Sequence, residues 1–199
     1  MKRSLVLLAA LMIVPAASAA IVYDAGPGSG APPAMLGPYD ITQFPLDPQA
    51  VFADVSTVDS PLGGQLGFSI PMSHRRIGSG WATWSHGYTG DVYYSNGATS
   101  VTMTMPPTTA AFRFYVEPNP FSLQTFEAVA DDGTSSGSYT AHGSSGATFA
   151  GFYGTGSLIS SIALTGSTDF AVGEFGIAVP EPASFALLAL GGLALIRRR

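Results

Sequence analysis

Apolar and polar residues alternate along most of the chain between residues 51 and 178. This period of two is typical of β-strands, because successive side chains point to opposite faces of a sheet. The clearest runs of alternating apolar positions are Leu66, Phe68 and Ile70; Val101, Met103 and Met105; and Phe112, Phe114 and Val116. Each run predicts a strand that buries one face.

Three more strands are expected further along, at about residues 148–153, 158–164 and 169–177. The last run changes parity, because Phe170 and Val172 fall on one face and Phe175 on the other. We predict a β-bulge at Gly173-Glu174 that returns the later apolar residues, Ile177 included, to the core face.

Turn signals separate these strands. Asn96-Gly97 predicts a type I′ hairpin between a strand at 91–95 and the strand that follows it. Asp132-Gly133 predicts a second turn, and the Gly/Ser-rich stretch 133–146 leaves room only for a short strand around Tyr139. No stretch between 40 and 178 has the period of an amphipathic helix.

These patterns predict an all-β, antiparallel β-sandwich or jelly-roll-like single domain over residues 51–178. Residues 20–50 contain Gly-Pro-Gly and Pro-Pro sequences, and we expect a turn-rich, irregular segment there. Residues 1–19 combine a positive start, an apolar run and the small residues Ala17 and Ala19. That combination predicts a signal helix. We expect the protein to be exported through the Sec translocon and signal peptidase to cut after Ala19.

The C-terminal segment 179–199 has three parts. The tripeptide Pro180, Glu181 and Pro182 precedes fourteen uncharged residues, 183–196, and the chain ends in Arg197, Arg198 and Arg199. Fourteen helical residues span about 21 Å, so they predict a short transmembrane helix. The arginines are expected to stay on the cytoplasmic side.

These three parts, in this order, resemble the PEP-CTERM sorting signal of Gram-negative bacteria. The resemblance implies that Pro180, Glu181 and Pro182 are recognised by an exosortase. It also implies that the helix anchors the protein briefly in the inner membrane and that Arg197–Arg199 stop transfer. The family accompanies exopolysaccharide and biofilm production. Residues 149–175 resemble the C-terminal strands of β-sandwich ectodomains on such proteins, most of which have no assigned activity.

The chain has 8 Lys and Arg against 13 Asp and Glu, and five of the basic residues lie at the two ends. Only Arg75, Arg76 and Arg113 lie between them, so the middle of the chain is strongly acidic. This distribution excludes a nucleic-acid partner, which requires a basic surface. The absence of cysteine excludes disulfides, thiolate zinc sites and a cysteine nucleophile.

Both tryptophans lie in the stretch 74–94, which is also rich in tyrosine, histidine and arginine. Aromatic rings stack on sugars, and polar side chains beside them bind hydroxyls or anionic groups. The candidate glycan contacts are Trp81, Trp84, His86, Tyr88 and Asp91. Alternatively one tryptophan belongs to the core, because Trp81 and Trp84 have opposite strand parity.

No metal, cofactor or catalytic residue is expected. The three histidines lack ligand spacing, and Asp131-Asp132 is interpreted as a solvated turn, with a calcium-binding loop as the alternative. Asp91 and Glu117 could form a glycosidase pair only if the fold brought them together.

We therefore expect a non-catalytic structural or interaction protein of the envelope or extracellular matrix, associated with exopolysaccharide. The alternative is a carbohydrate-binding module that uses residues 81–94. The body is expected in the periplasm while the anchor lies in the inner membrane, and afterwards at the cell surface or in the matrix.

Overall fold

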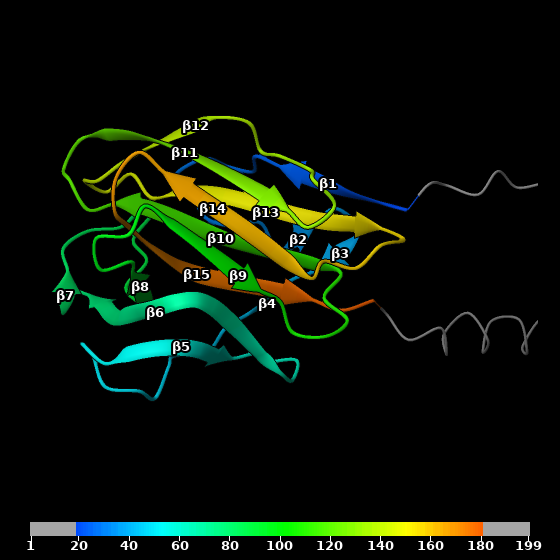
Figure 1. Cartoon of the computed structure of the whole chain (residues 1–199), viewed down its shortest axis with the longest axis horizontal. Coiled ribbons are helices and arrows are strands. Elements are labelled where there is room, and N and C mark those ends of the chain that lie inside the picture. The colour runs from blue at the N-terminus through cyan, green and yellow to red at the C-terminus, as the bar shows by residue number, and fades with distance from the viewer. Residues whose placement is uncertain (1–18, 181–199) are drawn as a thin grey trace, which may run out of the picture.

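Fifteen strands form the part of the chain that the computed structural model describes, residues 19–180 (Figure 1). They are β1 Ala20–Asp24, β2 Met35–Leu36, β3 Tyr39–Asp40, β4 Thr42–Gln43, β5 Asp54–Asp59, β6 Gln65–Ile77, β7 Gly80–Trp81, β8 Asp91–Tyr94, β9 Ser100–Thr104, β10 Ala111–Pro118, β11 Leu123–Ala130, β12 Tyr139–His142, β13 Thr148–Thr155, β14 Ser161–Gly166 and β15 Phe170–Ala178. No helix occurs in this range, which confirms the all-β prediction.

Several predictions concern other residues. The signal helix with Ala17, the residues Glu181 and Pro182, the transmembrane helix and Arg197–Arg199 lie outside the described part. Residues 19–180 contain no helix long and apolar enough to cross a bilayer.

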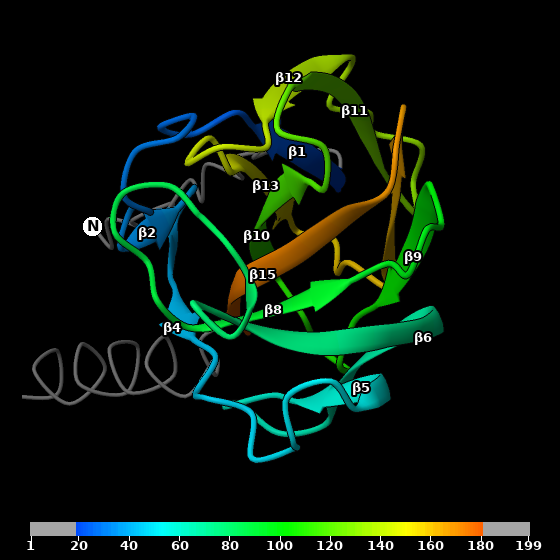
Figure 2. The same cartoon turned by 90° about the vertical axis from the view of Figure 1, so that its left-hand side faces the viewer.

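Thirteen strands belong to one curled sheet, and apart from a short parallel contact between β6 and β7 all neighbours are antiparallel. The order along the main path is β1-β13-β10-β15-β8-β6-β9-β14-β11-β12, while β4 pairs with β15, and β5 and β7 pair with β6. Figure 2 shows the sheet curling so that the strands at its two ends, β1 and β12, come near each other. The two layers expected of a sandwich are thus halves of one sheet.

Strand β6 joins the two halves. Its residues 73–75 pair with β8, and its residues Gly67 and Phe68 pair with β9. The predicted Asn96-Gly97 turn lies between β8 and β9, with φ of 52° and 90°, and the Ala98 N–H donates to the Ser95 carbonyl at 3.0 Å. The predicted hairpin is nevertheless wrong. The thirteen-residue β6 accommodates β8 and β9 end to end along one side, so they do not pair with each other.

The predicted bulge in β15 is confirmed. Arg113 of β10 lies opposite Gly176 and Tyr115 lies opposite Gly173, so two residues of β15 face the single residue Phe114. Glu174 has a positive φ of 54° at this point. The extra residue restores the parity, and the apolar side chains of β15 on both sides of the bulge join one core.

The central strands β10 and β15 are buried on both faces. The larger apolar cluster fills the inside of the curl and contains the predicted runs on β6, β9 and β10. A second cluster, with Trp84, Tyr115 and Phe149, lies on the outer face. The expectation of one buried face is therefore wrong for β10, where Arg113 and Tyr115 are also buried, because two segments of chain cover the outer face. These are the N-terminal segment around Leu36 and the loop 78–90.

The N-terminal segment 20–50 is irregular only in part. It supplies β1, which pairs with β13 from Ala20 to Asp24, and the short strands β2, β3 and β4. Turns and bends occupy residues 26–30, as the glycines and prolines predict. The segment is therefore part of the fold, because the apolar residues of β1 complete the sheet beside β13.

Both ends of the described chain lie at the same edge of the molecule. Ala20 pairs with Thr155, and Ala178 pairs with Ala111 two strands away. In Figure 1 β1 begins and β15 ends on the right, while β7 and β8 lie on the left. Strand β10 runs between these two ends of the molecule.

Truncation tests how close the fold comes to the C-terminal segment. Ile177 is fully buried and pairs with Phe112 and Thr42, whereas Pro180 is exposed. We expect residues 20–180 to unfold cooperatively, and removal of residues 177–180 to lower the free energy of unfolding by about 2–5 kcal/mol. Urea denaturation measures both, with removal of 179–180 alone as the control. Equal loss in the two truncations would contradict the role of Ile177.

Candidate functional site

The loop 78–90 is attached to the outer face of the sheet through buried carboxylates. Glu117, on β10, is fully buried. Its Oε2 accepts the Trp81 indole N–H at 2.6 Å, and its Oε1 accepts the Thr83 hydroxyl at 3.1 Å. The backbone N–H of Gly146 adds a longer bond of 3.4 Å. Glu117 therefore fixes the first half of this loop.

Glu174, on the bulge of β15, fixes the second half. Its Oε2 accepts the Trp84 indole N–H at 3.1 Å, and its Oε1 lies 2.9 Å from His86 Nε2. Ser85 Oγ lies 2.9 Å from the other ring nitrogen of His86. The order Ser85, His86, Glu174 is that of a hydrolase triad. Ser85 is only 1% exposed, however, and lines neither the cavity beside Arg75 nor the cavity beside Pro45. The three side chains hold the loop against β15.

Asp91 lies in a different buried network. Its Oδ1 accepts Arg76 Nε–H at 2.7 Å and lies 3.1 Å from His74 Nε2, and its Oδ2 accepts the Asp47 backbone N–H at 2.6 Å. Strand β15 separates β8, which contains Asp91, from β10, which contains Glu117. Each carboxylate has its own partners, so the glycosidase pair considered from the sequence does not form.

These environments move the carboxyl pKa values in opposite directions. Burial raises the pKa of Glu117, although the Trp81 and Thr83 hydrogen bonds oppose the rise. Burial likewise raises the pKa of Glu174 against the opposing effects of His86, Trp84 and the cationic Arg113. Burial also acts to raise the pKa of Asp91, but hydrogen bonds from Arg76, the Asp47 backbone and His74 outweigh it, and the pKa is lowered.

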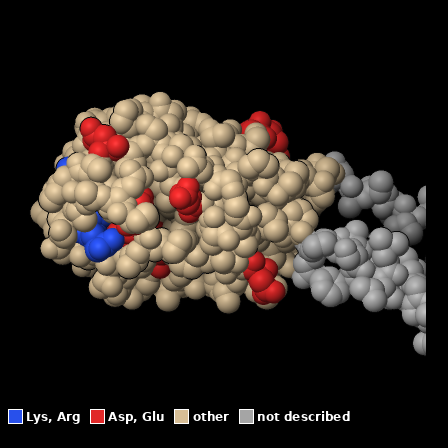
Figure 3. All heavy atoms as spheres, turned by 90° about the horizontal axis from the view of Figure 1, so that it is seen from below, with Lys and Arg blue, Asp and Glu red and all other residues tan. Residues whose placement is uncertain are grey.

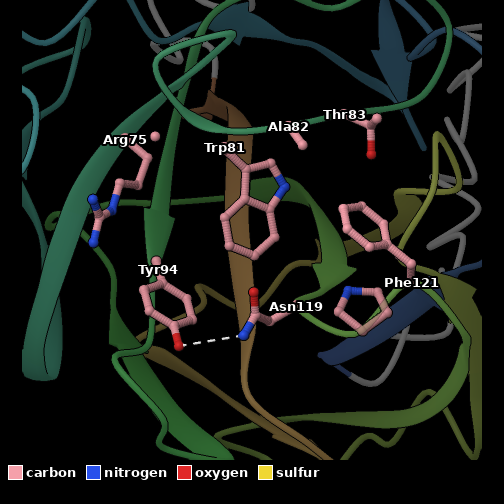
Figure 4. Close-up of a pocket in the computed structure, with 10 residues that line it drawn as sticks. Arg75, Trp81, Ala82, Thr83, Tyr94, Asn119 and Phe121 are labelled. Carbon is pink, nitrogen blue, oxygen red and sulfur yellow. Dashed lines mark hydrogen bonds between the residues drawn. The ribbon is translucent and has the colours of Figure 1, made fainter.

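A cavity of about 260 Å³ lies where the loop 78–90 meets the end of β10 (Figure 4). Its lining residues are Arg75, Gly80, Trp81, Ala82, Thr83, Tyr94, Pro118, Asn119, Phe121 and Gly143. The Trp81 and Tyr94 rings are tilted against each other at 5.6 Å between centroids. In Figure 4 Phe121 lies on the other side, with Asn119 between. We call this cavity the aromatic pocket.

Polar contacts fix the floor of the aromatic pocket. The Tyr94 hydroxyl donates to Asp169 Oδ2 at 2.6 Å, and Asn119 Nδ2 donates to the same oxygen at 2.9 Å. Burial and Asp169 raise the pKa of Tyr94 to about 12, so the phenol stays protonated at neutral pH. The pocket thus presents aromatic faces and amide groups, and none of its lining residues is acidic.

The structure separates the five candidate glycan contacts. Trp81 is half-buried and lines the pocket. Trp84 belongs to the outer core, Asp91 is buried and pairs with the partly exposed Arg76, and the His86 side chain, 12% exposed, binds Glu174. Tyr88 donates its hydroxyl to the Asp91 carbonyl at 3.1 Å. The alternative interpretation, in which one of the two tryptophans belongs to the core, is therefore correct for Trp84.

Other pocket residues were missed because they come from distant loops. Asn119 and Phe121 follow β10, and Gly143 follows β12. One signal was available: Glu117 ends an apolar strand, so a buried carboxylate requiring donors could have been anticipated.

The described residues show no cluster of three or more His, Asp or Glu side chains suited to a metal ion. Asp131 accepts the backbone N–H and hydroxyl of Ser160, and Asp132 accepts the N–H groups of Thr134 and Ile21. These carboxylates bind turns and strand ends.

The raised pKa of Glu117 predicts a pH-dependent stability. The folded state keeps this proton at a higher pH than the unfolded chain, so the group's contribution to the free energy of unfolding falls as pH rises through the raised pKa. Glu117→Gln removes the titration. The stability of the variant relative to the wild type should therefore rise as the pH increases above about 4, the ordinary pKa of a glutamate. Urea titrations at each pH measure this.

The exposed Glu127 on β11 provides a matched control. Glu127→Gln makes the same chemical change on the surface, and its urea titrations are compared with those of Glu117→Gln at each pH. A Glu117→Gln difference that stays constant with pH would contradict the raised pKa.

Comparison with known proteins identifies the C-terminal segment. Residues 178–199 match the PEP-CTERM protein-sorting motif. The match begins at Ala178, the last residue of β15, and includes the exposed Pro180. No curated protein matches the chain. The resemblance found from the sequence is confirmed: residues 178–199 form a PEP-CTERM sorting motif, which implies an exported protein that is anchored transiently in the membrane and processed by an exosortase.

Proposed function

We propose that the β-domain is a non-catalytic saccharide-binding domain, delivered by its sorting motif to the cell surface or extracellular matrix. The observation that supports this most is the aromatic pocket, where Trp81, Tyr94 and Phe121 surround one cavity. Aromatic rings bind the C–H faces of sugars by stacking. Backbone and amide groups beside the rings provide partners for hydroxyls.

The size and composition of the pocket favour binding over catalysis. Its volume of about 260 Å³ is below the roughly 300–1,000 Å³ of typical small-molecule sites, which suits a polymer contacted on one side. A glycosidase usually needs two carboxyl groups about 5–10 Å apart beside the scissile bond. The lining residues of the pocket include no carboxylate.

The position of the pocket suits a tethered protein. Pro118, at the end of β10, lines the pocket, whereas Ala111, at the start of β10, pairs with Ala178 beside the sorting motif. The pocket therefore lies at the opposite end of β10 from the end at which the sorting motif begins. An exopolysaccharide chain outside the cell could reach it before or after cleavage.

The proposed route follows from the two ends of the chain. The Sec translocon exports the protein, signal peptidase cuts after Ala19, and the body waits in the periplasm on its inner-membrane anchor. The exosortase then cuts near Pro180–Pro182, and the acidic body joins the exopolysaccharide at the surface or in a biofilm.

Substitution of Phe121 tests saccharide binding with little risk to the fold. Phe121 lines the pocket and is 67% exposed. We expect Phe121→Ala to weaken binding to host exopolysaccharide about three- to tenfold, the value of one aromatic contact. Leu123, 62% exposed but not in the pocket, supplies the control Leu123→Ala. Calorimetry measures both. Equal affinities of the two variants would contradict the assignment of the aromatic pocket as the binding site.

Substitution of Glu181 tests the sorting route. Glu181→Ala should leave export intact but keep the uncut protein in the inner membrane, because the recognised tripeptide loses its only charge. Intact mass and membrane fractionation detect this, with Glu127→Ala as a control that should be processed normally. Unchanged release of Glu181→Ala would count against the tripeptide as the recognition site.

A further inference from the structure

Cations are scarce and unevenly placed on this domain. Between residues 19 and 180 there are three arginines, no lysine, and twelve Asp and Glu residues. Arg113 is buried beneath the N-terminal segment. On the face seen in Figure 3 the blue side chains lie at the end of the molecule away from the grey segments. The exposed positive charge is therefore concentrated at the end that contains the aromatic pocket.

Arg75 and Arg76 are adjacent but differ in their partners. Arg76 is neutralised by Asp91 at 2.7 Å. Arg75 forms no ion pair with any residue in the range 19–180. Its guanidinium stacks instead on the Phe52 ring, 4.3 Å from the centroid, and lies 5.8 Å from the Tyr94 ring.

Stacking holds the Arg75 guanidinium in place without consuming its charge. Cation–π contacts occupy the flat face of the group and leave its N–H edges free for an anion. Arg75 lines the aromatic pocket, and Figure 4 shows it beside Tyr94 at the pocket edge. A carboxylate bound there would accept two parallel N–H groups.

We propose that the aromatic pocket selects acidic saccharides, with Arg75 binding the carboxylate of a uronic acid while Trp81, Tyr94 and Phe121 contact sugar rings. This inference rests on the proposed saccharide binding and adds the class of sugar. The acidic body repels an anionic polymer from most of the surface, so such a polymer can approach only at the end that carries the cation Arg75.

Two polymers that differ only in charge test the proposal. The probes are polygalacturonate and the same polymer after reduction of its carboxyl groups to alcohols, titrated into the full chain in a neutral detergent. We expect the wild type to bind the acidic polymer at least about tenfold more tightly, as for one charge-assisted hydrogen-bonded pair. Added salt should reduce this preference.

Variants assign the preference to Arg75. Arg75→Gln should remove the preference, because it lowers the affinity for the acidic polymer about tenfold more than the affinity for the reduced polymer, and Arg75→Lys should restore part of the preference. Arg76→Gln removes the same charge one residue away and should keep the preference, with circular dichroism checking the fold of each variant.

The outcomes separate this inference from the proposed function. Equal wild-type affinity for both polymers, or a preference that survives in Arg75→Gln, would overturn the role of Arg75 but leave saccharide binding in place. Binding to neither polymer would also overturn the acidic class. Failure to bind host exopolysaccharide in addition would remove the proposed function itself.

Discussion

The outer face of the sheet depends on the burial of two carboxylates against indole N–H groups. A buried carboxylate is costly unless hydrogen-bond donors surround it. Glu117 and Glu174 lie on the central strands β10 and β15, and both residues are buried. The loop 78–90 supplies Trp81 to the first and Trp84 to the second. These bonds fix the path of a loop that contains almost no regular structure, and that loop covers the second apolar cluster.

The aromatic pocket is a consequence of the same bonds. Glu117 accepts the Trp81 indole N–H, and the held ring lies beside Tyr94 and lines the cavity. A ring held by a buried hydrogen bond loses little further freedom when a ligand stacks on it. The indole N–H of Trp81 therefore holds the loop, and in the proposed binding mode the rest of the ring contacts the ligand.

The curl of the sheet places the two functional ends of the domain apart. Because β6 pairs with β8 and β9 in series, one sheet closes over the core without a break. Strand β15, between β10 and β8, then passes through the centre of the sheet and ends where the sorting motif starts. Its other end, at Phe170, lies next to Tyr94 and Pro118 on the neighbouring strands, near the pocket.

Local pattern was sufficient to predict the strands with clear alternation, such as β6, β9, β10 and β15, but it missed β5, β11 and the strands of the N-terminal segment. It also predicted the bulge at Gly173-Glu174, the backbone conformation of Asn96-Gly97 and the C-terminal motif, because each depends on a few consecutive residues. It was not sufficient for the pairing of β8 with β6, the burial of both faces of β10, or the separation of Trp81 from Trp84. Those features depend on which distant segments come into contact. The sequence shows that Glu117 and Glu174 are charged residues, but only the folded structure shows that the loop 78–90 supplies their hydrogen-bond donors. The sequence alone determined the clearest strands and the C-terminal sorting motif of this protein, and the tertiary structure decided which aromatic residues face solvent, because burial is set by contacts between residues far apart in the chain.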